Sequence, residues 1–365
     1  MSKIALPTYP ATDDVWKSLK RERRPIIIYG MGNGADKLLW QFEKYGISYA
    51  DFMASDGFVR GHFFHGIRVK GLREIQSLYP EFVIVLSFAS NREEVLSLFS
   101  SLDSSFDMYI PDMPVAGNAY FTSEFYNENY AKIALAYEAL QDDFSKNLYA
   151  SILHFKLSGK LRWLLSFCSK KEEIYSILSE KDVRVALDGG AYNGDTAKEF
   201  LSEFTNISRI LAVEPDPKTF RRLCRTASGE FFGAEKIEPI NAALGSHEGE
   251  CIVHASGNRN TSLVGASYEY KEETIPALTI DKICEKTAPD FIKLDIEGEE
   301  LNALLGAVKT IREYSPALLI SLYHRSEDIF SLILYMRESY PNYRLYLRRI
   351  ACVPAWEIDL LALPT

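Results

Sequence analysis

The sequence contains the same local pattern twice: a short apolar run, largely β-branched, ends at glycines and leads into a stretch with helical periodicity. The first copy begins at residues 25–30 (PIIIYG) and the second at residues 183–190 (VRVALDGG). After each copy, runs of strand character alternate with stretches of helical spacing. Strands that alternate with helices predict parallel sheets covered by helices, so we expect an α/β protein with two doubly wound sheets.

The chain of 365 residues is too long for one typical core, which favours more than one domain. We predict an N-terminal domain over residues 1–114, a helical linker over 115–180 and a C-terminal domain over 181–365. Aromatic residues at helical spacing in the linker fit a packed core better than the wall of a substrate cleft. The last two strands are too close in sequence for a crossover helix, so they predict an antiparallel hairpin at the sheet edge.

Composition narrows the class of partner and the compartment. A formal net charge of −9 argues against a nucleic-acid-binding surface, which needs clustered positive charge. The five cysteines form no CxxC pair, which is typical of thiols in a reducing compartment. No apolar run approaches the ~18 residues needed to cross a bilayer. We therefore expect a soluble cytoplasmic protein. The sequence does not decide whether it forms a homo-oligomer.

One acidic residue precedes the second glycine loop and another lies within it. Asp188 closes the strand before the loop, and Asp195 lies inside it. Two carboxylates would repel the pyrophosphate of a dinucleotide, but they suit a ligand with an ammonium and a sulfonium, which describes S-adenosylmethionine. Gly190 and Gly194 allow close approach of the backbone, and Thr196 is expected to help cap the following helix.

Glu214 ends the next predicted strand, in AVEPD. A carboxylate at this position can accept hydrogen bonds from both ribose hydroxyls of a nucleoside. NAD sites use the same device, so Glu214 alone does not choose between the two cofactors. The acidity of the loop favours S-adenosylmethionine.

Five motifs, in order, carry a resemblance to a known family: DGGAYNGDT, VEPDP, INAALG, TIDKI and DFIKLDIEGEE. Together they resemble the FkbM family of S-adenosylmethionine-dependent methyltransferases over residues 183–363. The segment ISLYHRSEDI is similar to a bacterial branch with an extra N-terminal Rossmann-like domain. The resemblance implies a class I methyltransferase domain in the C-terminal half and a smaller Rossmann-like domain before it. It also implies an O-methyltransferase acting on a hydroxyl of a sugar, glycan or natural product.

The resemblance also implies which residues bind the donor. Glu214 would bind the ribose, Pro215 and Asp216 would lie near the adenine edge, and Asn241 and Ala242 would border the adenine. A turn residue that bonds its own backbone is the alternative for Asn241. The residues implied at the loop and the methionine part are Asp188, Gly189, Gly190, Ala191, Asn193, Gly194 and Thr196.

Catalysis needs a group that takes the proton of the acceptor hydroxyl. Candidates are expected at the carboxyl ends of the strands, where Asp295, Glu297 and His324 stand. His324 is favoured as the base because imidazole titrates near neutral pH. The alternatives are that His324 caps the following helix and that Glu297 favours a helix start.

Two further features stay open. Asp295, Glu297 and His324 could instead hold Mg²⁺ or Mn²⁺, but no tight ligand motif accompanies them, so a base without a metal is favoured. The polar loop at residues 256–267 could be a substrate lid in which Asn260 and Ser262 touch the acceptor, or a plain surface loop.

The first glycine loop, GMGNGA at residues 30–35, fits the dinucleotide fingerprint, with an acidic residue some twenty positions later. Gly30, Gly32 and Asp56 are the residues expected at a second nucleotide site, and a loop without ligand is the alternative. An NAD(P)- or nucleotide-sugar-dependent enzyme working from this domain, with the C-terminal domain as a regulatory binder, is therefore the second function considered. A non-catalytic S-adenosylmethionine-binding scaffold is a third.

Overall fold

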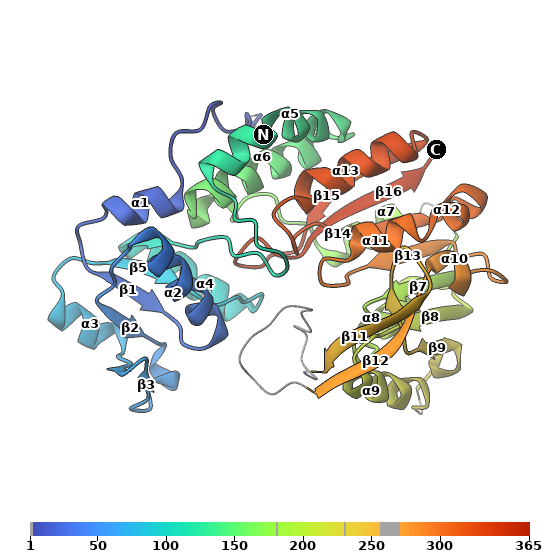
Figure 1. The fold of residues 1–365 in the computed structure, drawn as a ribbon, viewed down its shortest axis with the longest axis horizontal. Coiled ribbons are helices and arrows are strands. Elements are labelled where there is room, and N and C mark those ends of the chain that lie inside the picture. Colours follow the sequence, from blue (N-terminus) through green and yellow to red (C-terminus); the bar gives the residue numbers. More distant parts are fainter. Residues whose placement is uncertain (1–2, 180–181, 230, 256–270) are drawn as a thin grey trace.

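The computed structural model of the protein describes residues 3–179, 182–229, 231–255 and 271–365. Its two largest sheets, one wholly and one mainly parallel, have helices around them and are joined by a helical segment (Figure 1). The predicted α/β fold with two doubly wound sheets is confirmed. Within the described residues, no helix is long and apolar enough to cross a lipid bilayer.

The N-terminal sheet has four parallel strands in the order β2-β1-β5-β6. Every residue of β1 and β5 is buried, which explains why these strands are continuous apolar runs. A small hairpin, β3–β4, follows β2. The strands are β1 (Ile26–Tyr29), β2 (Asp51–Met53), β3 (Phe63–Phe64), β4 (Ile67–Arg68), β5 (Val83–Leu86) and β6 (Asp107–Tyr109). The helices are α1 (Val15–Arg21), α2 (Asn33–Tyr45), the 3-10 turn η1 (Asp56–Phe58), α3 (Leu72–Leu78) and α4 (Glu93–Ser105).

The linking segment is helical, as predicted. It contains α5 (Ser123–Ala139), α6 (Asp143–Ser158), the 3-10 turn η2 (Leu161–Trp163) and α7 (Lys171–Leu178). Helix α5 packs against α13 of the C-terminal part, and α6 packs against strand β15. The aromatic side chains Tyr126, Tyr149 and Phe155 are fully buried, so the interpretation of this stripe as core is confirmed.

The C-terminal sheet has seven strands in the order β15-β16-β14-β13-β7-β8-β9. The predicted hairpin is confirmed, because β15 and β16 pair antiparallel at one edge and β16 also pairs antiparallel with β14. The strands are β7 (Val185–Gly189), β8 (Arg209–Val213), β9 (Ile237–Ile240), β13 (Phe291–Leu294), β14 (Ala317–Ser321), β15 (Tyr343–Arg349) and β16 (Ile358–Pro364). The helices are α8 (Asp195–Glu203), α9 (Pro217–Ala227), the 3-10 turn η3 (Ala234–Lys236), α10 (Ile280–Ile283), α11 (Glu300–Leu305), α12 (Val308–Tyr314) and α13 (Asp328–Ser339).

A separate three-stranded sheet, which the sequence did not predict, stands beside the seven-stranded one. Its strands are β10 (Ala243–Leu244), β11 (Gly249–Ala255) and β12 (Lys271–Leu278). Strands β11 and β12 form an antiparallel pair, and β10 adds to β12 in parallel. This sheet supplies Cys251 and Val253 to the wall of the cavity described next.

Candidate active site

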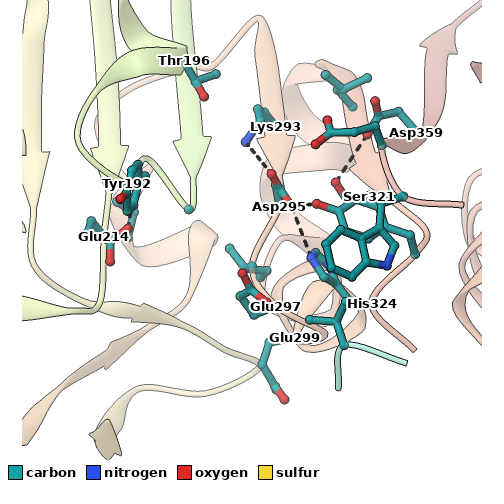
Figure 2. Close-up of a pocket in the computed structure, with 18 of the residues that line it drawn as sticks. Tyr192, Thr196, Glu214, Lys293, Asp295, Glu297, Glu299, Ser321, His324 and Asp359 are labelled. Atoms are coloured by element: carbon teal, nitrogen blue, oxygen red, sulfur yellow. Dashed lines mark hydrogen bonds and ion pairs between the residues drawn. The ribbon is translucent and has the colours of Figure 1, made fainter. Parts of the chain in front are cut away.

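A cavity of about 730 Å³ opens at the carboxyl ends of strands β7, β8, β13 and β14. This is where ligands bind in open α/β sheets, because loops diverge there and leave a crevice. Figure 2 shows Glu214 and Tyr192 on one side of the cavity and Lys293, Asp295 and His324 on the other. The cavity runs across the edge of the sheet and is lined at the ends of five neighbouring strands, β8, β7, β13, β14 and β16.

The predicted site residues divide into two groups. Those that line the cavity are Gly190, Thr196, Glu214, Pro215, Ala242, Asp295, Glu297 and His324. Those that do not line it are Asp188, Gly189, Ala191, Asn193, Gly194, Asp216 and Asn241. Asn260 and Ser262 lie outside the described residues.

At two positions of the loop after β7, steric contacts explain why the residue is glycine. Gly190 has φ +80°, and a Cβ there would overlap the backbone carbonyl oxygen of Asp295. Gly194 has φ +85°, and its Cβ would lie 2.8 Å from the Thr226 methyl group. The loop therefore crosses directly over the end of β13 and brings the backbone of residue 190 into the cavity.

The start of helix α8 differs from the expectation. The N-cap is Gly194, which makes no side-chain capping bond, and the helix begins at Asp195. The Asp195 carboxylate accepts a hydrogen bond from the Thr196 N–H at 3.0 Å. The prediction that Thr196 caps this helix is therefore wrong, and its side chain lines the cavity instead.

Glu214 is held at the end of β8 by two backbone donors. Its Oε2 accepts from the Tyr192 N–H and its Oε1 from the Asp216 N–H, both at 2.9 Å. The side chain is buried, and burial raises the pKa of Glu214 to about 7 despite these two bonds. Each carboxylate oxygen keeps a second lone pair, so Glu214 can still accept hydrogen bonds from a ligand.

Asp216 and Asn241 fix the surroundings of Glu214 rather than the cavity surface. The Asp216 carboxylate caps helix α9 by accepting from the N–H groups of Lys218 and Thr219. The Asn241 side chain donates to the carbonyls of Glu214 and Pro215, at 2.8 and 3.1 Å. Asn241 is therefore not a turn residue bonding its own backbone; it ties the ends of β8 and β9 together.

Asp188 is fully buried beside a lysine that the sequence analysis did not single out. Lys293 stands opposite Asp188 on the neighbouring strand, and its Nζ lies 3.5 Å from Asp188 Oδ1 and 3.6 Å from Asp295 Oδ2. Burial raises the pKa of Asp188 to about 6, and Lys293 limits that rise. The sequence does contain a sign of this contact, because Lys293 lies inside the otherwise apolar strand FIKL and a buried ammonium needs charged partners.

Asp295 is the centre of a charged cluster. Its Oδ1 accepts from the Tyr323 hydroxyl at 2.9 Å and lies 3.4 Å from His324 Nε2. Burial acts to raise the pKa of Asp295, but the charges of Lys293 and His324 outweigh it and hold the pKa below its ordinary value. Asp295 therefore stays ionised at neutral pH and is a weak base.

His324 is buried, and both of its ring nitrogens lie beside carboxylates. Nδ1 is 2.9 Å from Glu300 Oε1, and Nε2 faces Asp295. Burial alone would lower the pKa of His324, but Glu300, Asp295 and Glu297 outweigh burial and raise it to about 9. At neutral pH the ring is an imidazolium, which cannot accept a proton, and this argues against the predicted role as base.

The helix-capping alternative for His324 also fails. Helix α13 begins at Asp328 with Glu327 as its N-cap. The backbone carbonyl of His324 instead accepts from the N–H groups of Val115 and Ala116 of the linking segment. The backbone of His324 therefore connects the loop after β14 to the linking segment.

Glu297 lies in the cavity in an unusual backbone conformation. Its φ is +59°, a value that costs energy for a residue with a side chain. Among the described residues, its Oε2 has no hydrogen-bond partner. Burial raises the pKa of Glu297 to about 7. Helix α11 begins at Glu300, so the helix-start alternative for Glu297 is wrong and Glu300 occupies that position.

Segments far apart in sequence complete the wall. Ser90, after β5 of the N-terminal sheet, pairs with Val353 through two backbone hydrogen bonds of 2.8 and 2.9 Å. This contact joins the N-terminal loop at residues 89–91 to the loop between β15 and β16, and both line the cavity. Trp356 from the latter loop stacks near Tyr323, with ring centres 6.4 Å apart. No local sequence pattern marks these residues, because only the tertiary fold brings them together.

The first glycine loop does not reach this cavity. Gly30, Gly32 and Asp56 are not among the lining residues. A Cβ on Gly30 would lie 2.5 Å from Ser87 Oγ, and a Cβ on Gly34 would overlap the Ser87 carbonyl oxygen. Ser87, which follows β5, therefore packs closely against both the loop after β1 and the first turn of α2, and this accounts for Gly30 and Gly34 without a ligand.

In the described part of the chain, no group of three or more His, Cys, Asp or Glu side chains has an arrangement that could hold a metal ion. Asp295 and His324 do lie together, but as an ion pair. Besides His324, the Asp295 carboxylate contacts the Lys293 ammonium and the Tyr323 hydroxyl, which are not the carboxylate and carbonyl ligands that Mg²⁺ prefers.

Comparison with known proteins adds two findings. Residues 188–349 match the family model described as the methyltransferase FkbM domain. The solved structure of methyltransferase FkbM from Methylobacillus flagellatus KT aligns with a TM-score of 0.70 and 20% identity, covering 95% of this chain and 92% of that one. At this identity the likeness shows the fold. The family model does not include the N-terminal sheet, so its assignment as an extra Rossmann-like domain stays a prediction.

Other solved structures align over about half of this chain. Precorrin-6y C5,15-methyltransferase from Geobacter metallireducens GS-15 has a TM-score of 0.34 and 11% identity over 55% of this chain and 94% of that one. Fibrillarin from Aeropyrum pernix has a TM-score of 0.31 and 14% identity over 50% and 67%. No curated protein matches the chain by sequence.

Proposed function

We propose that this chain is an S-adenosylmethionine-dependent methyltransferase that methylates a hydroxyl group of a small molecule, sugar or glycan. The observation that carries the proposal is the placement of Glu214, which two backbone donors hold at the cavity wall beside the glycine loop. The match of residues 188–349 to the methyltransferase FkbM domain supports it.

The donor would lie along the ends of β7, β8 and β9. Glu214 would accept hydrogen bonds from the two ribose hydroxyls, and the adenine would lie against Pro215 and Ala242, which line the same side. The backbone at Gly190 would pass under the sulfonium end. The Asp295 carboxylate, which lines the cavity, would then face the positive charge of the sulfonium.

Methyl transfer is a displacement in which the acceptor oxygen bonds to the methyl carbon as the carbon–sulfur bond breaks. The electron pair of that bond goes to sulfur, giving neutral S-adenosylhomocysteine, and the hydroxyl proton must leave. Because charge is neutralised in this step, alignment of the two reactants supplies much of the rate.

Glu297 is our candidate for the group that takes the proton. It lines the cavity, and its pKa of about 7 lies close to neutral pH, where a general base works best. Asp295 is too weak a base, and His324 is already protonated. We assign His324 the role of holding Asp295 in place, through the 3.4 Å contact between Nε2 and Oδ1.

We propose that the chain divides as the sequence predicts, into residues 1–114, 115–180 and 181–365, with the first part as an accessory domain. Ala89, Ser90 and Asn91 of that part line the cavity, which supports a share in enclosing the acceptor. Neither the family model nor the solved structures support an NAD(P)- or nucleotide-sugar-dependent enzyme working from this domain.

The test is calorimetric titration of the purified protein with S-adenosylhomocysteine and, separately, with NADH. We expect binding of S-adenosylhomocysteine with one site per chain and no binding of NADH. Binding of NADH alone would overturn the proposal in favour of the second function. Transfer of label from methyl-tritiated S-adenosylmethionine to a panel of hydroxyl compounds then separates an enzyme from a binding scaffold.

A further inference from the structure

One wall of the cavity belongs to helix α7, which precedes the residues matched by the family model. Lys171, Ile174 and Tyr175 of this helix line the cavity together with Thr196 and Glu199 of helix α8. Helix α8 follows the glycine loop directly, so this wall stands next to the part of the cavity where the donor's methionine end would lie. None of the α7 residues was singled out from the sequence.

Lys171 has fewer carboxylate partners than the other cations of the cavity. Among the lining residues, the positively charged side chains are Lys171, Lys293 and His324. Lys293 lies between Asp188 and Asp295, and His324 lies between Glu300 and Asp295, so both are already enclosed by carboxylates. The ion pair of Lys171 joins it to Glu199, with Nζ 2.8 Å from Oε2.

The Lys171 side chain is also open to a further partner. It is 53% exposed, against 13% for Lys293 and 1% for His324. An ammonium group has three donors, and one contact with Glu199 leaves two for other acceptors. Lys171 can therefore bind an anionic group of a ligand without giving up Glu199.

The donor carries such a group. Its amino-acid end has an ammonium and an α-carboxylate, in addition to the sulfonium. The many carboxylates of the cavity suit the two cationic groups, but they would repel the α-carboxylate unless a cation stood beside it. On the basis of the proposed function, we infer that Lys171 binds the α-carboxylate of the donor and that the Thr196 hydroxyl donates to the same carboxylate.

The inference makes the linking segment part of the donor site. Helix α7 would then supply a donor-binding residue from outside the region of the FkbM match, residues 188–349. The competing explanation is that the Lys171–Glu199 pair only fastens α7 to α8. Exposed ion pairs of this kind contribute ~0–1 kcal/mol to stability, so such a role would not depend on which ligand is bound.

Two probes that differ only at the amino-acid end separate these explanations. S-Adenosylhomocysteine has the α-carboxylate and the ammonium, and 5′-deoxy-5′-methylthioadenosine lacks both. We expect Lys171→Met to weaken binding of S-adenosylhomocysteine about tenfold while leaving methylthioadenosine unchanged, because a lost charge-assisted hydrogen bond at a partly exposed site is of this order. Lys171→Arg should restore most of the affinity.

Lys170 provides the matched control. It is the adjacent residue, exposed, at the N-cap of α7, and it is not among the lining residues. Lys170→Met should leave the calorimetric Kd of both probes unchanged. The melting temperatures of both variants should stay close to that of the wild type.

Three results would overturn the inference. Equal weakening of both probes by Lys171→Met would show that the lysine only positions α7, and no change with either probe would show that it does not contact the ligand. A loss with Lys170→Met as large as that with Lys171→Met would reduce the effect to general electrostatics. If the wild type bound neither probe, the proposed function itself would fail, which is a distinct outcome.

Discussion

Gly190→Ala should disrupt the loop that crosses the end of β13. Residue 190 has φ +80°, and an alanine in the left-handed region costs about 1–2 kcal/mol. Its Cβ would also overlap the Asp295 carbonyl oxygen, so the backbone must move, and overpacking of this kind costs about 1–3 kcal/mol more. We therefore expect the free energy of unfolding to fall by about 2–5 kcal/mol.

Gly66→Ala is the matched reference. Gly66 has φ +77°, nearly the same as Gly190, but nothing lies within 4 Å of its Cβ position. In Gly66→Ala the free energy of unfolding should fall only by the cost of the left-handed backbone conformation, about 1–2 kcal/mol. The two variants should thus differ by about 1–3 kcal/mol, which corresponds to about 2–12 °C in melting temperature at about 2–4 °C per kcal/mol.

The assay is thermal unfolding by scanning calorimetry, with and without S-adenosylhomocysteine. Gly190→Ala should show the lower melting temperature and no stabilisation by ligand, whereas Gly66→Ala should be stabilised as the wild type is. Equal melting temperatures together with normal ligand stabilisation in Gly190→Ala would refute the close approach of this loop to Asp295.

Further predictions concern charge and catalysis. Because the pKa of Glu214 is about 7 and ribose binding favours its ionised form, calorimetric affinity for S-adenosylhomocysteine should rise from pH 6 to pH 8, and a flat profile would argue against this contact. The free energy of unfolding without ligand should fall as pH rises from about 5 to 9, as seen by denaturant titration, since raised folded-state pKa values give stability that is lost above them. The groups concerned, with pKa values between about 6 and 9, are Asp188, Glu214, Glu297, His324, Asp328 and Asp359. With any acceptor found by label transfer, Glu297→Gln should lower turnover by roughly 10²–10⁴ with donor affinity kept, and near-normal turnover would remove Glu297 as the base. Gly32→Ala should leave the Kd of S-adenosylhomocysteine unchanged, because that residue does not line the cavity; loss of binding would mean that the two glycine loops are coupled.

Much of the fold was predictable because it depends on local patterns. Continuous apolar runs such as FVIVLSF and ALLISLY are what strands buried on both faces require, and β5 and β14 lie there. The spacing between the last two strands excluded a crossover helix, and they form the antiparallel hairpin. The three-stranded sheet β10-β12-β11 was missed because its order depends on long-range pairing.

The position of the candidate site could be predicted from the sequence, but the protonation states of its residues could not. Asp295 and His324 meet because each follows one of two neighbouring parallel strands, and strand ends can be read from sequence. The protonation of His324 depends on Glu300, which approaches from the start of another helix, and no spacing rule reveals that contact. The same holds for Lys171, Ser90 and Trp356, which reach the cavity from separate parts of the chain.

Titration of wild type and Glu214→Ala with S-adenosylhomocysteine tests the central claim most directly. Loss of a charge-assisted partner for two ribose hydroxyls should cost about 2–3 kcal/mol, or about 30- to 150-fold in Kd. Glu238→Ala is the control, because Glu238 is an exposed glutamate on the adjacent strand β9 that pairs with Arg209 and does not line the cavity. Circular dichroism should confirm that each variant is folded. We predict wild-type affinity in Glu238→Ala and a loss of at least thirtyfold in Glu214→Ala, whereas a folded Glu214→Ala protein with unchanged affinity would contradict the account.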